Sequence, residues 1–146
     1  MKIINTTNIQ KAINEIKKSE KPIIVKAQDD AFNRKILEYG KFDILLSPEA
    51  GKKRVSLRQE NSGLNHVLAK IAAKNQVAIG IDLEDISKLD KKEKASHLAK
   101  IMQNIKVCRK TGTKIILISK KNKREVLSLF MSLGASTKQA KEAEGL

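Results

Sequence analysis

The sequence predicts an α/β fold of repeated βα units, arranged as in a TIM barrel but with only about five parallel strands. Short apolar runs alternate with longer segments of helical period, which is the pattern of a mainly parallel sheet. Eight such units close a regular barrel and take about 250 residues, whereas this chain has 146. We therefore expect a truncated or incomplete barrel in a single domain, residues 1–146, with a doubly wound sheet as the alternative.

Five apolar runs of strand length supply the sheet, and each is nearly continuous, as expected for strands covered on both faces. The runs are Lys2–Asn5, Pro22–Ala27, Phe42–Ser47, Val77–Leu83 and Lys114–Ser119. In barrels and in open parallel sheets alike, active and binding sites lie at the carboxyl ends of the strands. The polar residues at these ends are Lys26, Ser47, Asp82 and Ser119. For the two serines, ordinary loop capping is the competing interpretation.

Segments of helical period lie between the strands. The first follows Thr6 or Thr7 and has an apolar stripe formed by Ile9, Ala12, Ile13 and Ile16. The second can be capped by Asp29 or Asp30, and its inward residues are Phe32, Ile36 and Leu37. The third runs to about Lys74 and is marked by Leu64, Val67, Leu68, Ile71 and Ala72.

The later helical segments carry clear start and stop signals. The fourth begins with the capping pattern Asp90-x-x-Glu93 and stops near Gly112. Its expected buried residues are Leu98, Met102 and Ile105. The fifth ends at Gly134 and carries Val126, Leu127, Phe130 and Leu133. A short tail helix follows, which Ser136 and Gln139 can cap.

The chain is strongly basic. Thirty Lys and Arg residues against sixteen Asp and Glu give a formal net charge of +14, which attracts polyanions and nucleic acid in particular. Residues 91–146 hold fourteen basic and four acidic residues, against sixteen and twelve in residues 1–90. Because there is no Trp, one Tyr and three Phe, stacking of bases on an aromatic platform is not expected. A solvated, lysine-rich surface is the alternative interpretation.

Signals for a membrane or for export are not found in the sequence. The longest apolar runs, such as Ile115 to Ile118, are far shorter than the roughly 20 residues of a membrane helix, and the N-terminus lacks a signal-peptide pattern. A cytoplasmic protein is therefore predicted. The single cysteine, Cys108, stands near Ile105 and Val107 and is expected to be a small buried apolar residue.

A long polar loop is predicted between Ser47 and the third helical segment. It lacks periodicity, and its Gly51-Lys52-Lys53 does not complete the phosphate-binding pattern GxxxxGK[ST]. The basic residues of this loop can contact RNA phosphates without reading sequence, and simple solvation is the alternative. They are Lys52, Lys53, Arg54 and Arg58.

Three consecutive segments resemble signatures of the ribonuclease P component 3 family, also called the thirty-kilodalton subunit family. They are residues 43–48 (DILLSP), 62–70 (SGLNHVLAK) and 75–83 (NQVAIGIDL), and the stretch GLNHVLAK is the most specific. The resemblance covers about residues 34–143 and implies a TIM-type barrel. The chain departs from the family pattern in three ways: fewer N-terminal βα units, a longer loop before Ser62 and a shorter loop after Ser119.

The resemblance also implies positions that contact RNA. The basic positions of the family match Arg34 or Lys35, Arg58, His66, Arg124 and Lys141. A further family lysine falls at Asn75, where the neighbouring Lys74 can substitute. Arginine can clamp a phosphate through a bidentate fork while lysine acts as a point charge, so the arginines are the preferred candidates. For His66, a structural hydrogen bond at the start of a helix is the alternative.

No catalytic residue is predicted in this chain. Its two histidines, His66 and His97, cannot build a three-histidine zinc site, and His97 is expected to be solvated in mid-helix. Two carboxylates, Asp82 and Glu84, are a weak basis for a cation site. The resemblance implies instead that a catalytic RNA removes the 5′ leader of precursor tRNA, with magnesium bound through the RNA and no cofactor bound by the protein. The isolated chain is then expected to be inactive.

The partners implied by the resemblance are ribonuclease P RNA and protein component 2, the latter in a heterodimer or heterotetramer. Precursor tRNA would be contacted indirectly, and no membrane is involved. Two other functions stay open. One is a general basic RNA-binding module, and the other is a free-standing barrel phosphoesterase.

Overall fold

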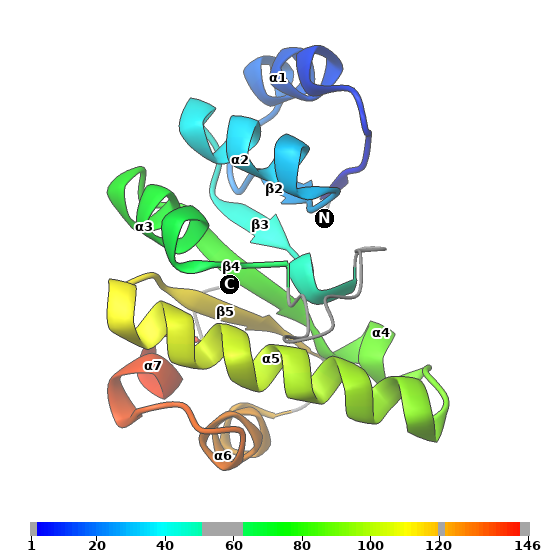
Figure 1. The fold of residues 1–146 in the computed structure, drawn as a ribbon, viewed down its shortest axis with the longest axis vertical. Coiled ribbons are helices and arrows are strands. Elements are labelled where there is room, and N and C mark those ends of the chain that lie inside the picture. Colours follow the sequence, from blue (N-terminus) through cyan, green and yellow to red (C-terminus); the bar gives the residue numbers. More distant parts are fainter. Residues whose placement is uncertain (1–2, 51–62, 120–121, 144–146) are drawn as a thin grey trace.

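A five-stranded sheet forms the centre of the protein (Figure 1). The computed structural model describes residues 3–50, 63–119 and 122–143. The strands are β1 (Ile3–Ile4), β2 (Ile24–Lys26), β3 (Ile44–Leu46), β4 (Ala78–Asp82) and β5 (Ile115–Ile118). Each strand lies inside the apolar run predicted for it, so all five predictions are confirmed.

The strands follow one another in chain order across the sheet, and every neighbouring pair is parallel. A doubly wound sheet reverses its strand order part-way, so the sequential order excludes that alternative and confirms the barrel-like one. Among the described residues β1 and β5 do not pair with each other, and the sheet is therefore open. Because crossovers between parallel strands are right-handed, sequential order places the connecting helices on one face.

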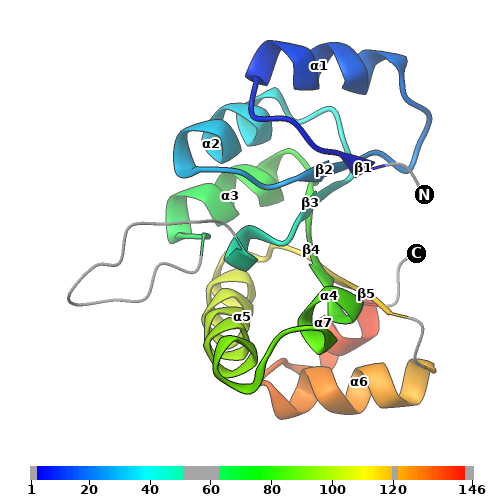
Figure 2. The same cartoon turned by 90° about the vertical axis from the view of Figure 1, so that its right-hand side faces the viewer.

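Helices cover that face, and Figure 2 shows α2, α3 and α5 together on one side of the sheet. The helices are α1 (Ile9–Lys18), α2 (Asp30–Tyr39), the 3₁₀ helix η1 (Pro48–Ala50), α3 (His66–Lys74), α4 (Leu83–Ser87), α5 (Lys91–Thr111), α6 (Lys123–Ser132) and α7 (Thr137–Glu142). Two of these, η1 and α4, were not predicted. Both are short and begin within two residues of a strand end, and Leu83 falls inside the run Val77–Leu83 that was predicted as one strand. Within the described ranges no helix is long and apolar enough to cross a membrane.

Both faces of the sheet are apolar, as the continuous runs predicted. On the helix-covered face the buried strand residues in register are Ile4, Val25, Leu45, Ile79 and Ile115, and they belong to the main core. On the opposite face a second cluster is formed by Ile24, Ile44, Leu46, Ala78 and Ile116. Cys108 is buried in the main core, where desolvation raises the pKa of its thiol to about 12, so it acts as the predicted apolar residue.

Three of the described helices begin at side-chain caps that the sequence indicated. Asp29 caps α2 and Asp90 caps α5, while Ser136 and Gln139 form the complete capping box of α7. Helix α1 was predicted to follow Thr6 or Thr7, and its cap is Asn8, whose side chain accepts a hydrogen bond from the N–H of Lys11. Asparagine is as good a cap as threonine, and it is the residue that directly precedes the apolar stripe.

Two residues predicted to face inward are instead exposed. Met102 is 48% exposed and Val67 is 53% exposed. In α5 the buried stripe passes through Ile101, Ile105 and Cys108, and Met102 lies about 100° further round the helix. Val67 likewise immediately precedes the buried Leu68 of α3. Hydrophobic character alone did not distinguish residues at the edge of the buried stripe from residues inside it.

The close packing of the second cluster generates a prediction at Gly80. A Cβ at this position would lie 2.6 Å from Cγ2 of Ile44 and 3.1 Å from Cδ1 of Leu46. Gly80→Ala should therefore lower the free energy of unfolding by about 1–3 kcal/mol, because a β-branched neighbour in a strand moves little. Urea denaturation measures this change. In an Ile44→Ala background the cost should nearly vanish, and an unchanged cost there would contradict the proposed clash.

Candidate nucleic-acid interface

The strand-end residues named from the sequence meet at one cavity of about 330 Å³. Its lining consists of Lys26, Ser47, Glu49, Asp82, Asp85, Ile86, Leu89, Glu93 and His97. Three predicted strand-end residues, Lys26, Ser47 and Asp82, are therefore brought together, whereas Ser119 is not part of this lining. The cavity lies where a barrel enzyme would carry its active site.

Several cavity residues already have structural roles. The Oδ1 atom of Asp82 accepts hydrogen bonds from the backbone N–H groups of Glu84 at 3.0 Å and Asp85 at 3.4 Å, which caps α4. Ser47 has a φ of 55° and its N–H donates to the carbonyl of Gly80 at 2.8 Å, so it turns the chain at the end of β3. In the part of the chain that the structure describes, no group of three or more His, Cys, Asp and Glu side chains is placed to hold a metal ion.

His97 lines this cavity and is half-buried, so the expectation that it is solvated was wrong. Desolvation lowers the pKa of its imidazole, and the positive charges of Lys100 and Lys26 lower it further, while Glu93 acts in the opposite direction. No sequence signal indicates this proximity, because Lys26 is 71 positions away and only the fold brings β2 beside α5. A neutral imidazole is favoured at this site.

The predicted RNA-contacting residues lie on the outer surface of the helical layer. Those that the structure describes are all exposed: Arg34, Lys35, His66, Lys74, Arg124 and Lys141. Arg58, with the other basic residues of its loop, falls outside the described residues.

These residues form two groups rather than one. Arg34 and Lys35 belong to α2, and His66 and Lys74 belong to α3, which packs against α2. Arg124 and Lys141 belong to α6 and α7, which pack against each other. Helix α5 lies between the two groups (Figure 1). A polyanion that contacts both must therefore extend across α5.

Arg34 carries one intrahelical contact. Its Nε lies 3.1 Å from Oε1 of Glu38, four residues later, and both side chains are more than half exposed. A surface pair of this kind stabilises by at most about 1 kcal/mol and is easily exchanged. The guanidinium retains donors that can bind a phosphate.

No family model matches the chain. Its fold is similar to that of one chain in a cryo-EM structure of archaeal ribonuclease P with mature tRNA, with a TM-score of 0.80 and 23% identity over 97% of this chain and 62% of that chain. It is 30% identical over 146 aligned residues to ribonuclease P protein component 3 of Methanosarcina acetivorans, covering 95% of this chain and 58% of that protein. The chain is similar to archaeal ribonuclease P protein component 3.

This finding confirms the resemblance that the motifs predicted. A second component 3, from Methanococcus vannielii, is 28% identical over 118 residues, which cover 81% of this chain and 48% of that protein. The chain spans about half the length of the curated relatives it matches.

The component 3 motif GLNHVLAK builds the start of α3. Gly63 has a φ of 82°, which favours glycine, and the buried Leu64 anchors the segment in the core. The Oδ1 atom of Asn65 caps the helix by accepting from the N–H of Leu68 at 2.8 Å. His66 follows as the first helical residue and points away from the core. Its exposure leaves the imidazole accessible to a partner.

Asn75, where the family pattern has a lysine, is committed to packing in this chain. Its Nδ2 donates to the carbonyl of Leu37 at 2.7 Å, which ties the end of α3 to α2. Gly40 lies directly against the Asn75 side chain, which leaves no room for a Cβ atom on residue 40. The adjacent Lys74 is exposed, so a positive charge is retained one residue earlier. The substitution of Lys74 for the family lysine stays a prediction.

The lowered pKa of His97 predicts a pH effect on stability. The unfolded state binds more protons than the folded state once the pH falls below about 6.5, so the folded protein should lose stability from there down through the folded-state pKa. In His97→Asn this loss should be smaller. Urea denaturation at about pH 7.5 and about pH 5 measures both slopes. Equal slopes for the two proteins would contradict the burial argument.

Proposed function

We propose that this chain is a protein subunit of ribonuclease P and supports a catalytic RNA that removes the 5′ leader of precursor tRNA. The observation that carries the proposal is the similarity in sequence to ribonuclease P protein component 3, together with the similarity in fold to one chain of archaeal ribonuclease P, over most of the chain. In this proposal the reaction takes place on the RNA, which also binds the magnesium, and the protein binds no cofactor. The net charge of +14 would neutralise repulsion between RNA phosphates.

Arg124 is the candidate with the strongest physical argument for a role outside folding. It lies in the first turn of α6, whose cap Asn122 accepts from the N–H of Glu125 at 2.9 Å. A cation at this end opposes the helix macrodipole and costs about 0.3–1 kcal/mol. A bound phosphate would be attracted by the dipole and by the guanidinium together. Lys141 lies in the last turn of α7, where the dipole favours a cation even without RNA.

RNA binding should be steeply sensitive to salt, and this sensitivity can be assigned to residues. The logarithm of the affinity should fall linearly with the logarithm of salt concentration, with a slope that reports several phosphate contacts. Arg124→Ala and Lys141→Ala should each reduce the slope by about one. Lys17→Ala removes an equal charge from α1, at the far end of the helical layer from α6, and should leave the slope unchanged. A flat response of the wild type would refute phosphate-driven binding.

A protein partner is expected from the open sheet. The edges of β1 and β5 are not paired with each other among the described residues, and Ile3 on β1 is 38% exposed. Exposed strand edges and apolar side chains are usually covered in stable assemblies. We infer that the chain pairs with ribonuclease P protein component 2, as a heterodimer or a heterotetramer.

Reconstitution tests the whole proposal. The chain is purified and assayed alone, with component 2, with the RNA and with both, and leader removal is followed at fixed magnesium. Cleavage should require the RNA and should be stimulated by the two proteins together. Cleavage by the chain alone would favour the phosphoesterase alternative. Equal affinity for unrelated duplex RNA, without stimulation of cleavage, would favour the general RNA-binding module.

A further inference from the structure

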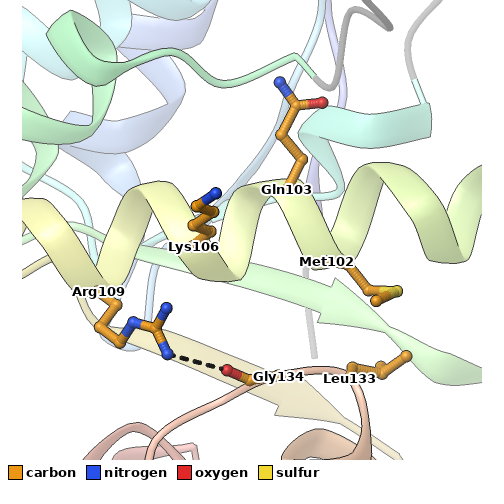
Figure 3. Close-up of a pocket in the computed structure, with 6 residues that line it drawn as sticks. All are labelled: Met102, Gln103, Lys106, Arg109, Leu133 and Gly134. Carbon is orange, nitrogen blue, oxygen red and sulfur yellow. Dashed lines mark hydrogen bonds between the residues drawn. The ribbon is translucent and has the colours of Figure 1, made fainter.

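A groove on the helical layer is lined by none of the candidate RNA-contacting residues. It runs between α5 and the turn that joins α6 to α7, and has a volume of about 370 Å³. Its lining residues are Met102, Gln103, Lys106, Arg109, Leu133 and Gly134 (Figure 3). Met102 and Leu133 lie at one end and Arg109 at the other.

The floor of the groove is apolar and adaptable. Met102 is 48% exposed because it lies beside the buried stripe of α5, and Leu133 is only partly buried against the main core. An exposed methionine contributes little to folding, but its flexible thioether adapts to the shape of a partner. Contact with an apolar side chain of a partner would remove Met102 and Leu133 from water.

The rim of the groove is positively charged. Lys106 and Arg109 are exposed, and α5 has no acidic residue after Glu93. An Nη1 atom of Arg109 donates to the carbonyl of Gly134 at 3.3 Å, which holds the guanidinium across the groove at the α6–α7 turn. The remaining guanidinium N–H groups can bind a carboxylate.

We propose that this groove binds an acidic segment of a partner protein, in which an apolar side chain next to Asp or Glu residues enters between Met102 and Leu133. The carboxylates would pair with Lys106 and Arg109. This inference rests on the proposed function, because the partner is then a protein of the same ribonucleoprotein.

The lining favours a protein over the other occupants. No aromatic side chain lines the groove, so a nucleotide base would have nothing to stack on. A second copy of the chain would bring a further formal charge of +14 to a rim that is already positive. An acidic peptide with an apolar anchor complements both the floor and the rim.

Association with the purified protein subunits of the chain's own ribonuclease P, measured without RNA, tests this inference. Met102→Glu should weaken it by at least about tenfold, because a carboxylate would replace the apolar floor and repel the acidic partner. The matched control is Met131→Glu, since Met131 is 49% exposed on α6 but does not line the groove. The control should change the affinity by less than about twofold.

A crosslinking measurement identifies the occupant. Because Cys108 is buried, a photo-reactive label can be attached selectively to the Met102→Cys variant of the full chain. In the particle assembled with RNA, the label should crosslink to a protein segment rich in Asp and Glu. Crosslinks to RNA alone, or equal affinities of the Met102→Glu and Met131→Glu variants, would overturn the inference.

Leader removal by the same preparations separates the two proposals. A wild-type mixture that removes no leader refutes the proposed function, and with it the inference that rests on it. If the wild-type mixture removes the leader but the Met102→Glu and Met131→Glu variants bind the protein subunits with equal affinity, only the inference about the groove is refuted.

Discussion

Parallel pairing of consecutive strands is the constraint on which the rest of the structure depends. Strand order follows chain order from β1 to β5, and right-handed crossovers then place the helices in the same order on one face. Contacts between α1 and α2, α2 and α3, and α3 and α5 repeat this order. The absence of a Cβ at Gly80 lets Ile44 and Leu46 pack closely on the opposite face. The positions of the exposed basic residues on the described helices follow from this arrangement.

Besides the bond from Arg109 to Gly134, side-chain hydrogen bonds to distant carbonyls join parts of the helical layer. Asn75 bonds to Leu37, Thr113 bonds to Ala69 at 2.7 Å, and Gln139 bonds to Ile105 at 3.0 Å. The last two are buried, where an unpaired polar group is costly, so they select one position for each element. Gln139 holds α7 on α5, and this contact determines where Lys141 lies. Hydrogen bonds inside the helical layer thus determine the positions of exposed side chains such as Lys141.

Electrostatics explains why such a layer suits a ribonucleoprotein. Basic residues on neighbouring helices repel one another, and the free protein pays for this in stability. Bound phosphates would remove the repulsion, so RNA binding and stability should be coupled. Under the two proposals, one surface would carry two kinds of recognition: phosphate contacts on α6 and α7, and an apolar site for a protein in the groove at the α6–α7 turn.

Local signals in the sequence were sufficient for much of the fold. The apolar runs located all five strands, and Asp29, Asp90 and the Ser136–Gln139 pair were read as caps because a cap acts within three or four residues of itself. The motif GLNHVLAK is local in the same way, because its consecutive residues build the start of one helix. It could therefore indicate the family without knowledge of the tertiary structure. Its His66 was also placed on a helix correctly.

The sequence by itself determined the type and order of the five strands and of all the described helices except η1 and α4, the basic character of the chain and its family resemblance. Only the tertiary structure decided that Met102 faces a groove, that His97 lies beside Lys26, and that the basic candidates form two groups on either side of α5. The physical reason is the range of the interactions. Periodicity and capping act between neighbours in the chain, whereas burial, cavities and charge clusters depend on which distant segments the parallel sheet brings together.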